Sequence, residues 1–358
     1  MKKRILCGTL ALLLICSLCA CSLPVNLPDG NLGSEPAAAA MDGSTMQVSF
    51  FDVGQGDCEL IVLPDGKTIL IDAGESKSAN DIISFLEEKG VSRLDYVIAT
   101  HPHADHIGGM QKVIEAFDVG EIYMPKVEHD TKTYENLLLT IQEKGLRIHT
   151  AKEGVSLIDE GGVSAQFVAP CSDSYKDLNN YSAVLRLTYG DVSFLFMGDA
   201  EQESEDQITA DVSADIIKLG HHGSSTSSSQ AFLEAVSPSA AIISCGKDNS
   251  YGHPHEETLQ TLDRLGVESY RTDQDGTVTV TTDGTAYRIE TAKSKKTGSI
   301  ALMPPVFHNS LTLRNFPFCH APHCKQNAKQ QDCANQQAQP SVCRKAGHNI
   351  TGKRTPRH

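Results

Sequence analysis

A cluster of metal-binding side-chain types stands at residues 100–106, which read Thr-His-Pro-His-Ala-Asp-His. Three imidazoles and a carboxylate so close together are costly to bury unless they share a partner. Both groups are ligands for zinc and related divalent ions. In a loop that leaves a strand, His101 and His103 can converge on one ion while Asp105 and His106 turn towards a second. Two such ions activate a hydroxide nucleophile and hold both sides of a displacement. The cluster therefore predicts a metal-dependent hydrolase with two divalent ions, zinc being expected and manganese the alternative.

The elements that must position this cluster alternate between strands and helices. Short apolar runs predict strands at 48–53, 59–63, 68–71, 95–100, 147–150, 164–169, 183–188, 193–197, 216–219, 240–244, 269–271, 277–281 and 286–289. Helical spacing of apolar residues predicts helices at 79–89, 109–117, 134–144, 229–235 and 256–265. This order predicts an α/β domain in which two sheets pack together and helices cover them.

The N-terminus reads as an export signal. Basic residues at positions 2–4 precede an apolar run at 5–15, which is too short for an ordinary membrane-spanning helix. Residues 18–21 (LCAC) resemble the lipobox of bacterial lipoproteins, in which the cysteine is lipidated. We expect lipidation of Cys21, and the alternative is secretion with cleavage near Ala20. Either way the protein is expected outside the cytoplasm, anchored to the bacterial cell membrane or secreted.

Composition divides the chain into four parts. We expect a lipoprotein signal peptide at 1–21, a flexible linker at 22–45, one hydrolase domain at 46–292 and a basic tail at 293–358. The tail contains cysteines and histidines, so a zinc module is one interpretation of it. Their spacing matches no paired Cys-x-x-Cys pattern, and we expect a disordered tail; translation in a wrong frame is the third interpretation.

The charge is unevenly distributed along the chain. The formal net charge is −14, but residues 1–292 carry 20 basic and 44 acidic side chains, a charge of −24. So acidic a body excludes a broad surface that binds phosphates regardless of sequence. A polyanionic substrate would need metal ions and local basic groups to hold it.

The histidine cluster resembles the His-x-His-x-Asp-His motif of the metallo-β-lactamase fold superfamily. Three further motifs follow the order found in that superfamily: LIDAG at 70–74, FMGD at 196–199 and KLGHHGS at 218–224. Other motifs are similar to the extracellular nuclease-like domain of ComEC competence proteins and its stand-alone secreted relatives: DVGQGD at 52–57, NNYS at 179–182 and YGHPH at 251–255. The resemblance spans roughly residues 47–290 and implies a four-layer αββα sandwich with a single catalytic domain.

The resemblance also implies a ligand set. His101 and His103 would bind the first ion, and Asp105 and His106 the second. Asp199 would bridge the two ions. One histidine of the pair His221 and His222 would complete the second site, and we prefer His221 because it comes first after the strand. Asp105 and Asp199 would thereby belong to the catalytic centre.

One departure from the superfamily concerns the first metal. β-Lactamases and glyoxalase-type members supply another histidine before the bridging aspartate, and here only His129 and His149 are candidates, neither in the expected setting. The expected place holds Asn180 and Ser182, which either contact the substrate or cap the turn before a strand. ComEC-like domains share this departure, which implies a first metal with fewer protein ligands.

Three other residues near the motifs have two interpretations each. His253 is a candidate catalytic residue that touches a phosphate or leaving group, or an inert loop histidine. Asp57 could lie at the mouth of the site, although the Gly-Gln-Gly turn explains its local sequence. Asp72 is expected to anchor the loop by hydrogen bonds rather than to bind metal.

These observations favour hydrolysis of phosphodiesters, with extracellular DNA as the expected substrate and the membrane as a partner through the lipid anchor. One alternative is a small cell-surface phosphodiester, ester or lactone. Another is a non-catalytic accessory in DNA uptake. β-Lactam hydrolysis is disfavoured by the absent histidine, and no obligate protein partner is inferred.

Overall fold

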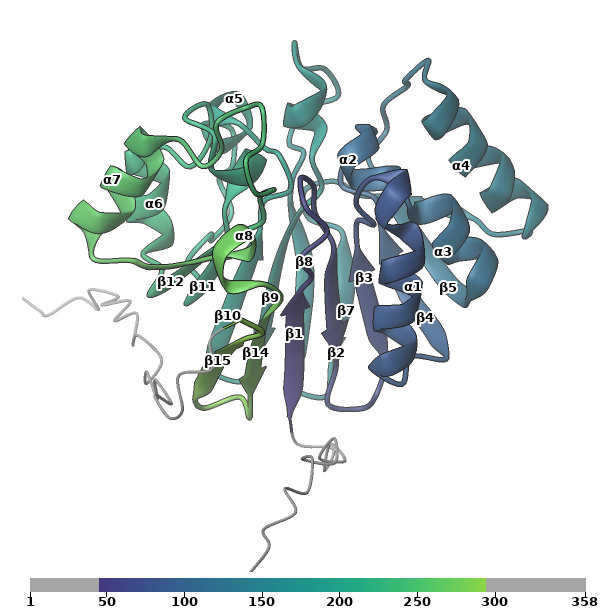
Figure 1. The fold of residues 1–358 in the computed structure, drawn as a ribbon, viewed down its shortest axis with the longest axis horizontal. Helices are drawn as coiled ribbons and strands as arrows, with labels where there is room; N and C mark the ends of the chain where they lie inside the picture. Colours follow the sequence, from purple (N-terminus) through teal and green to yellow (C-terminus); the bar gives the residue numbers. More distant parts are fainter. Residues whose placement is uncertain (1–44, 294–358) are drawn as a thin grey trace, which may run out of the picture. The chain divides into compact units, whose positions relative to one another are not determined.

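Two mixed β-sheets make up the centre of the computed structural model, which describes residues 45–293 (Figure 1). The first sheet has eight strands, in the order β15 (Tyr287–Thr291), β14 (Val278–Thr282), β1 (Met46–Phe50), β2 (Glu59–Val62), β3 (Thr68–Ile71), β4 (Arg93–Ile98), β5 (Asp118–Met124) and β6 (Ile148–Thr150). The second has seven, in the order β13 (Glu268–Arg271), β12 (Ala240–Ile243), β11 (Ile216–Lys218), β10 (Val192–Phe196), β9 (Val184–Tyr189), β8 (Val163–Ala169) and β7 (Ser156–Glu160).

Helices cover the outer faces of both sheets (Figure 1). The α-helices are α1 (Ala79–Glu88), α2 (Ala104–Ile107), α3 (Met110–Ala116), α4 (Lys132–Glu143), α5 (Gln202–Glu205), α6 (Gln230–Val236), α7 (Glu256–Leu265) and α8 (Thr272–Asp275). Three 3₁₀ turns, η1 (Ser76–Ser78), η2 (Leu178–Tyr181) and η3 (Gly220–Gly223), lie in the connections.

Three apolar clusters hold these layers together. The central cluster joins the inner faces of the two sheets, where the rings of Phe50 in β1 and Phe196 in β10 stack with centroids 6.0 Å apart. A second cluster packs α1, α3 and α4 on the first sheet, and includes Leu86 and Val97. A third packs α6 and α7 on the second sheet, where Leu233 contributes. The predicted αββα sandwich is therefore confirmed.

Parallel strand pairs decide where the functional loops meet. In the first sheet β3 through β6 run parallel, and in the second sheet β10 through β13 do so. Segments that follow the carboxyl ends of such strands gather at one edge of a sheet, where open α/β proteins place their sites. Asp72 follows β3, His101 follows β4, and Asp199 follows β10 in this way.

Most predicted elements are present within two residues of their expected ends, but one strand is shorter than predicted and several elements were not predicted. The strand predicted at 48–53 ends at Phe50, because the Gly-Gln-Gly turn redirects the chain. Strands β5 and β7 and the short helices α2, α5 and α8 were not predicted. Strand β7 lies at the edge of its sheet, and three of its five side chains are exposed. An edge strand lacks the apolar alternation that marks a buried one.

Several sequence predictions fall on other parts of the chain. The signal peptide with Cys21, all but the last residue of the linker, and the tail after residue 293 lie outside the described residues. Within residues 45–293, no helix is long and apolar enough to cross a membrane.

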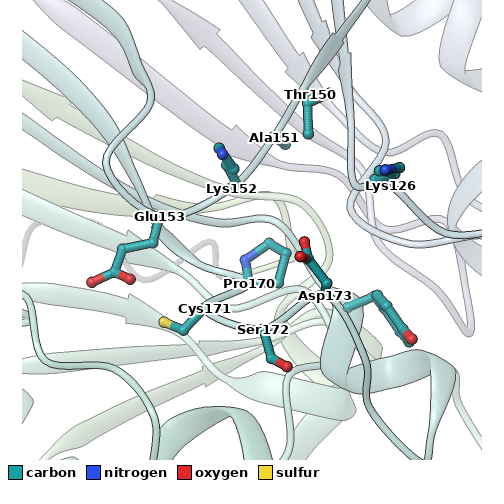
Figure 2. Close-up of a pocket in the computed structure, with 10 residues that line it drawn as sticks. Lys126, Thr150, Ala151, Lys152, Glu153, Pro170, Cys171, Ser172 and Asp173 are labelled. Atoms are coloured by element: carbon teal, nitrogen blue, oxygen red, sulfur yellow. The ribbon is translucent and has the colours of Figure 1, made fainter.

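Pockets open at the loop edge of the sheets. One, of about 630 Å³, is lined by segments 150–153 and 170–173 and contains none of the predicted metal-binding residues (Figure 2). Its lining mixes two lysines, Lys126 and Lys152, with the acids Glu153 and Asp173. A pocket of about 320 Å³ lies on the predicted cluster and includes His103, Asp105, Asp199 and His222. The predicted metal-binding residues therefore lie in the second pocket.

Candidate metal centre

The loop after β4 is fixed by Asp72, as expected. Its Oδ1 accepts the Thr100 amide at 2.8 Å, and its Oδ2 accepts the Thr100 hydroxyl at 2.6 Å. The same Oδ2 lies 2.7 Å from Nδ1 of His106, which donates to it. Because Nδ1 of His106 is occupied in this way, only Nε2 is available to a metal ion.

A first group of donors consists of His101, His103 and Asp199. His101 is buried, and its Nε2 lies 3.7 Å from Asp199 Oδ2 and 3.1 Å from Nδ1 of His103. The opposite ring nitrogen of His101 faces the hydroxyls of Thr100 and Ser182 at 3.1 and 3.4 Å. Hydroxyl partners on the Nδ1 side direct the Nε2 atom towards Asp199.

A second group of donors also includes Asp199, contacts both of its carboxylate oxygens and is more deeply buried. It contains His106 and His222, with Asp105 at its edge: Nε2 of His222 lies 3.4 Å from Asp105 Oδ2 and 3.5 Å from Asp199 Oδ1. Nε2 of His106 lies 3.1 Å from Asp199 Oδ2. Both Nε2 atoms and Asp199 Oδ1 are buried and have no hydrogen-bond partner among the described residues. Buried polar atoms are rarely left so, and together they form a set of donors that fits a divalent cation.

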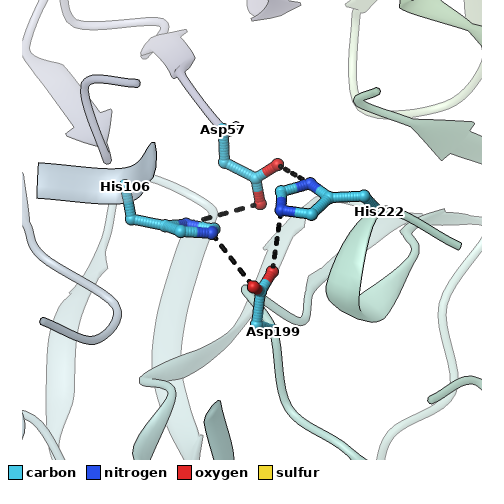
Figure 3. A group of neighbouring side chains, drawn as sticks. All are labelled: Asp57, His106, Asp199 and His222. Atoms are coloured by element: carbon cyan, nitrogen blue, oxygen red, sulfur yellow. Dashed lines mark ion pairs between the residues drawn. The ribbon is translucent and has the colours of Figure 1, made fainter. Parts of the chain in front are cut away.

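Asp57 also belongs to this group by distance, but it lies on the other side of the rings. In Figure 3, Asp57 and Asp199 flank the imidazoles of His106 and His222 from opposite sides. Asp57 Oδ1 is 3.2 Å from Nδ1 of His222, whose N–H donates to the Ser244 carbonyl at 3.0 Å. Asp57 is therefore placed to orient and charge-balance His222, rather than to share an ion with Asp199.

The Gly-Gln-Gly turn brings Asp57 into this place. A Cβ on Gly56 would lie 2.2 Å from the carbonyl oxygen of Asp105, and φ at Gly56 is +130°, so only glycine fits. The Asp57 amide donates to that carbonyl at 3.3 Å. On its other oxygen Asp57 pairs with Lys218 of β11, at 2.7 Å, and both side chains are 1% exposed. Neither Lys218 nor a structural role for Asp57 was predicted.

The buried carboxylates around His106 and His222 need positive charge nearby to balance them. Burial alone would lower the pKa of His222, but the carboxylates of Asp199 and Asp57 raise it to about 10. Burial also opposes the charged form of His106, yet Asp199 and Asp72 raise its pKa well above the ordinary value. Burial would raise the pKa of Asp199, and the two imidazoles hold it well below. Without a metal, protons thus balance the carboxylates, and metal binding must release them.

The structure corrects the preference for His221 over His222. Both residues have positive φ, 48° and 55°, inside η3, a backbone conformation that costs about 1–3 kcal/mol for a non-glycine residue. This turn directs His222 into the buried group, while His221 stays 24% exposed. Nδ1 of His221 lies 3.1 Å from Glu201 Oε1, and its Nε2 is 3.9 Å from Asp199 Oδ2. His221 therefore lines the pocket beside the donors, and His222 is one of them.

A pair of variants tests this assignment. We expect His222→Ala to lower affinity for the ion of the second group by more than about 100-fold, because losing a group that merely orients a ligand already costs 10–100-fold. His221→Ala should leave that affinity within a few-fold of the wild type. Calorimetric titration of the chelator-stripped chain with Mn²⁺ measures both. The assignment is wrong if His221→Ala weakens binding more than His222→Ala does.

Of the two interpretations of Asn180 and Ser182, the contacts favour support of the turn over substrate contact. Both side chains are buried, at 2% and 0% exposure. Asn180 Oδ1 accepts the amides of Glu201 and Ser204, both at 3.1 Å, and Ser182 Oγ accepts the Asp199 amide at 3.0 Å. They position the segment that carries Asp199 from behind, and they do not line the pocket.

Asn179 lines the pocket in their place, and its Oδ1 is buried without a partner among the described residues. His253 lines it as well, with a ring centroid 5.3 Å from that of His221.

The two candidates for a third histidine in the first group of donors do not line the pocket. His129 donates through Nδ1 to the Pro102 carbonyl at 3.3 Å, and His149 stacks on Tyr123. The first group thus has two histidines, as the departure in the sequence indicated.

Comparison with known proteins agrees with this geometry. The profile described as the Metallo-beta-lactamase superfamily matches residues 51–247. The chain belongs to that superfamily. Superfamily members are generally hydrolases, and the buried His/Asp donors fit divalent metal ions.

Competence proteins are among the relatives of this metallo-β-lactamase domain. It is 30% identical over 289 residues to ComE operon protein 3 of Bacillus subtilis (strain 168), covering 75% of this chain and 36% of that protein. It is 32% identical over 281 residues to Competence protein ComA of Neisseria gonorrhoeae, covering 74% and 38%. The chain thus spans little more than a third of each relative. The resemblance to competence proteins found in the sequence is confirmed.

Among solved structures, the chain is similar to the metallo-beta-lactamase fold protein YhfI from Bacillus subtilis. It aligns with 63% of this chain and 95% of its own, with a TM-score of 0.43 and 15% sequence identity.

Proposed function

We propose that the protein is an exported metal-dependent phosphodiesterase that cleaves DNA outside the cytoplasm. The observation that carries the proposal is the sharing of Asp199 by two groups of donors, since paired ions suit in-line displacement at phosphorus. When bound, divalent ions activate water as a nucleophile and offset the charge that develops on the phosphoryl oxygens. Zinc or manganese fits the nitrogen and carboxylate donors.

The residues of the chain divide the remaining tasks. His101, His103 and Asp199 would hold the first ion, and His106, Asp105, Asp199 and His222 the second. His221, with Glu201 holding its Nδ1, presents Nε2 to the pocket. His253 and Asn179 provide further polar contacts for a phosphate in the same pocket. With only two histidines, the first group leaves more room for substrate than a three-histidine site does.

DNA is favoured over other phosphodiesters by the relatives, one of which is named a competence protein. Export and anchoring through Cys21 would place the enzyme where extracellular DNA is met; Cys21 lies outside the described residues. A small surface phosphodiester or ester is the second candidate, because a pocket of about 320 Å³ is within the range of small-molecule sites.

Cleavage of labelled DNA tests the proposal. The full chain, loaded with Mn²⁺ or Zn²⁺, is expected to shorten a labelled single-stranded oligonucleotide, and a chelator should stop the reaction. His103→Ala should abolish the cleavage, because it removes a donor of the first group without disturbing the buried second one. Intact DNA in the presence of demonstrably bound metal would refute DNA as the substrate. A choline-phosphate diester and a chromogenic ester, assayed in parallel, would then identify the second candidate.

A further inference from the structure

An exposed aromatic ring stands at the mouth of the metal pocket. Tyr251 is 65% exposed, more than any other large hydrophobic residue between residues 45 and 293, and it lines the pocket together with Asp199 and His222. Water-exposed rings gain free energy when a ligand covers them, and such rings are enriched where binding occurs. The ring of Tyr251 is therefore a candidate contact for part of the substrate that lies beyond the reacting phosphate.

The ring is held in place before any ligand arrives. It stacks on His253 with centroids 5.6 Å apart and planes inclined by 21°. The loop beneath is fixed by Asn249, whose Nδ2 donates to the carbonyls of Gly246 and His253 at 2.9 and 2.6 Å and whose Oδ1 accepts the His253 amide at 3.0 Å. A fixed ring loses little conformational freedom on binding, which favours affinity.

A third pocket of about 550 Å³ continues from the metal pocket past Tyr251. The two pockets share Tyr251 and Gln55, and Gln55 is tied to the Tyr251 loop through its Oε1, which accepts the Gly246 amide at 3.1 Å. A chain-like substrate whose phosphate lies at the metal donors can therefore continue over the tyrosine ring into this third pocket. We call it the flanking pocket.

Lysines are prominent in the flanking pocket, although the body of the protein is acidic. Its carboxylates each have a cation: Glu75 pairs with Lys77 at 2.6 Å, Asp52 with Lys293 at 3.1 Å and Asp273 with Arg271 at 2.8 Å. Lys247 is exposed and has no ion pair within residues 45–293. Because Arg271, from outside the pocket lining, pairs with Asp273, Lys247 can meet an anion in the flanking pocket.

We propose that Tyr251 stacks on the base next to the cleaved phosphodiester, and that Lys247 meets the following backbone phosphate, so that the substrate is a single strand. This inference rests on the proposed DNA cleavage. A base in a duplex is already stacked and paired, whereas a single-stranded base can lie on an aromatic ring. One ring and one lysine also contact only a short stretch of DNA, so few phosphates approach the acidic surface of the protein.

Two tyrosine variants of the full chain test the stacking. With a single-stranded thymidine decamer as substrate, Tyr251→Ala should raise KM by about 10-fold, which lies within the range measured for losing one base–aromatic stack. Tyr251→Phe keeps the ring and should stay within about twofold of the wild type. With a decamer of the same length that carries abasic sugars, wild type and Tyr251→Ala should have equal KM.

A lysine variant tests the phosphate contact. Lys247→Gln should reduce the salt dependence of DNA affinity by about 0.7 in the slope of log K against log salt, the value for one phosphate of a single strand. The matched control is Lys112→Gln in α3, an exposed lysine that lines neither pocket, which should leave the slope unchanged.

The outcomes separate this inference from the function on which it rests. If the wild type cleaves the decamer but Tyr251→Ala has the wild-type KM, the stacking is refuted and DNA cleavage stands. The same holds if Tyr251→Ala raises KM as much on the abasic decamer as on the thymidine decamer. A duplex cleaved in preference to the single strand also refutes it. If the metal-loaded wild type neither binds nor cleaves any DNA, both proposals fall.

Discussion

Asp199→Asn is expected to lower phosphodiester hydrolysis by about 10³-fold, because metal ions supply several kcal/mol of transition-state stabilisation and each 1.36 kcal/mol is a factor of ten. The expected loss of rate is this large because Asp199 is the one residue that both groups of donors share. Replacing the carboxylate by an amide removes the negative charge that both groups share and one of the two donor oxygens of Asp199. Initial rates with bis(p-nitrophenyl) phosphate, at saturating Mn²⁺, measure the loss.

A control variant separates this effect from general damage to the fold. Asp191 is exposed and immediately precedes β10, the strand whose other end leads to Asp199. Asp191→Asn makes the same chemical change at the far end of that strand and should keep the wild-type rate. Equal rates in Asp199→Asn and the wild type, with normal metal content, would remove Asp199 from the catalytic centre.

Asp57→Asn is expected to destabilise the protein by about 3 kcal/mol, since removing one partner of a buried ion pair leaves the other charge buried and unpaired. Lys218 would be that charge, at 1% exposure. The same variant should weaken metal binding in the second group by about 10–100-fold, because a carboxylate next to Nδ1 of His222 is lost. Urea unfolding measures the first effect and calorimetric titration with Mn²⁺ the second.

Two further variants separate the effect of the Asp57–Lys218 ion pair on stability from the effect of Asp57 on metal affinity. Asp57→Asn combined with Lys218→Met removes both charges and should recover most of the stability, while metal affinity stays low. Glu59→Gln is the control in the next strand. Burial and the neighbouring Asp57 raise the pKa of Glu59 well above its usual value, which favours the uncharged acid, so an amide replaces it at little cost. An Asp57→Asn protein as stable as the wild type, or a double variant with restored metal affinity, would contradict this account.

How far the sequence alone predicts the centre depends on how the donors are distributed along the chain. The first motif is contiguous, so its residue types and spacing are sufficient to predict a metal site. Asp199 and the paired histidines come from distant strands, and only a resemblance to known motifs connected them to the cluster. The choice of His222 over His221 required the backbone, because two positive φ angles decide which imidazole enters the buried group.

Interactions between distant residues were the part that the sequence did not reveal. Asp57 and Lys218 are 161 positions apart, and a lysine at the end of a short apolar strand ordinarily suggests a solvent-exposed strand end. Asn180 and Ser182 were predicted near the site correctly, but their buried partners show that they support Asp199. The layers of the sandwich were predictable because apolar periodicity is local, and strand β7 was missed where that periodicity is weak.

The central claim, that two ions share Asp199, is tested most directly by counting bound ions with native mass spectrometry. Manganese is the appropriate ion, because the cysteines and histidines of the tail favour softer metals. We expect two Mn²⁺ per wild-type chain, one in His103→Ala and none held tightly in Asp199→Asn. A wild type that binds no manganese, or an Asp199→Asn chain that still binds two ions, would contradict the claim.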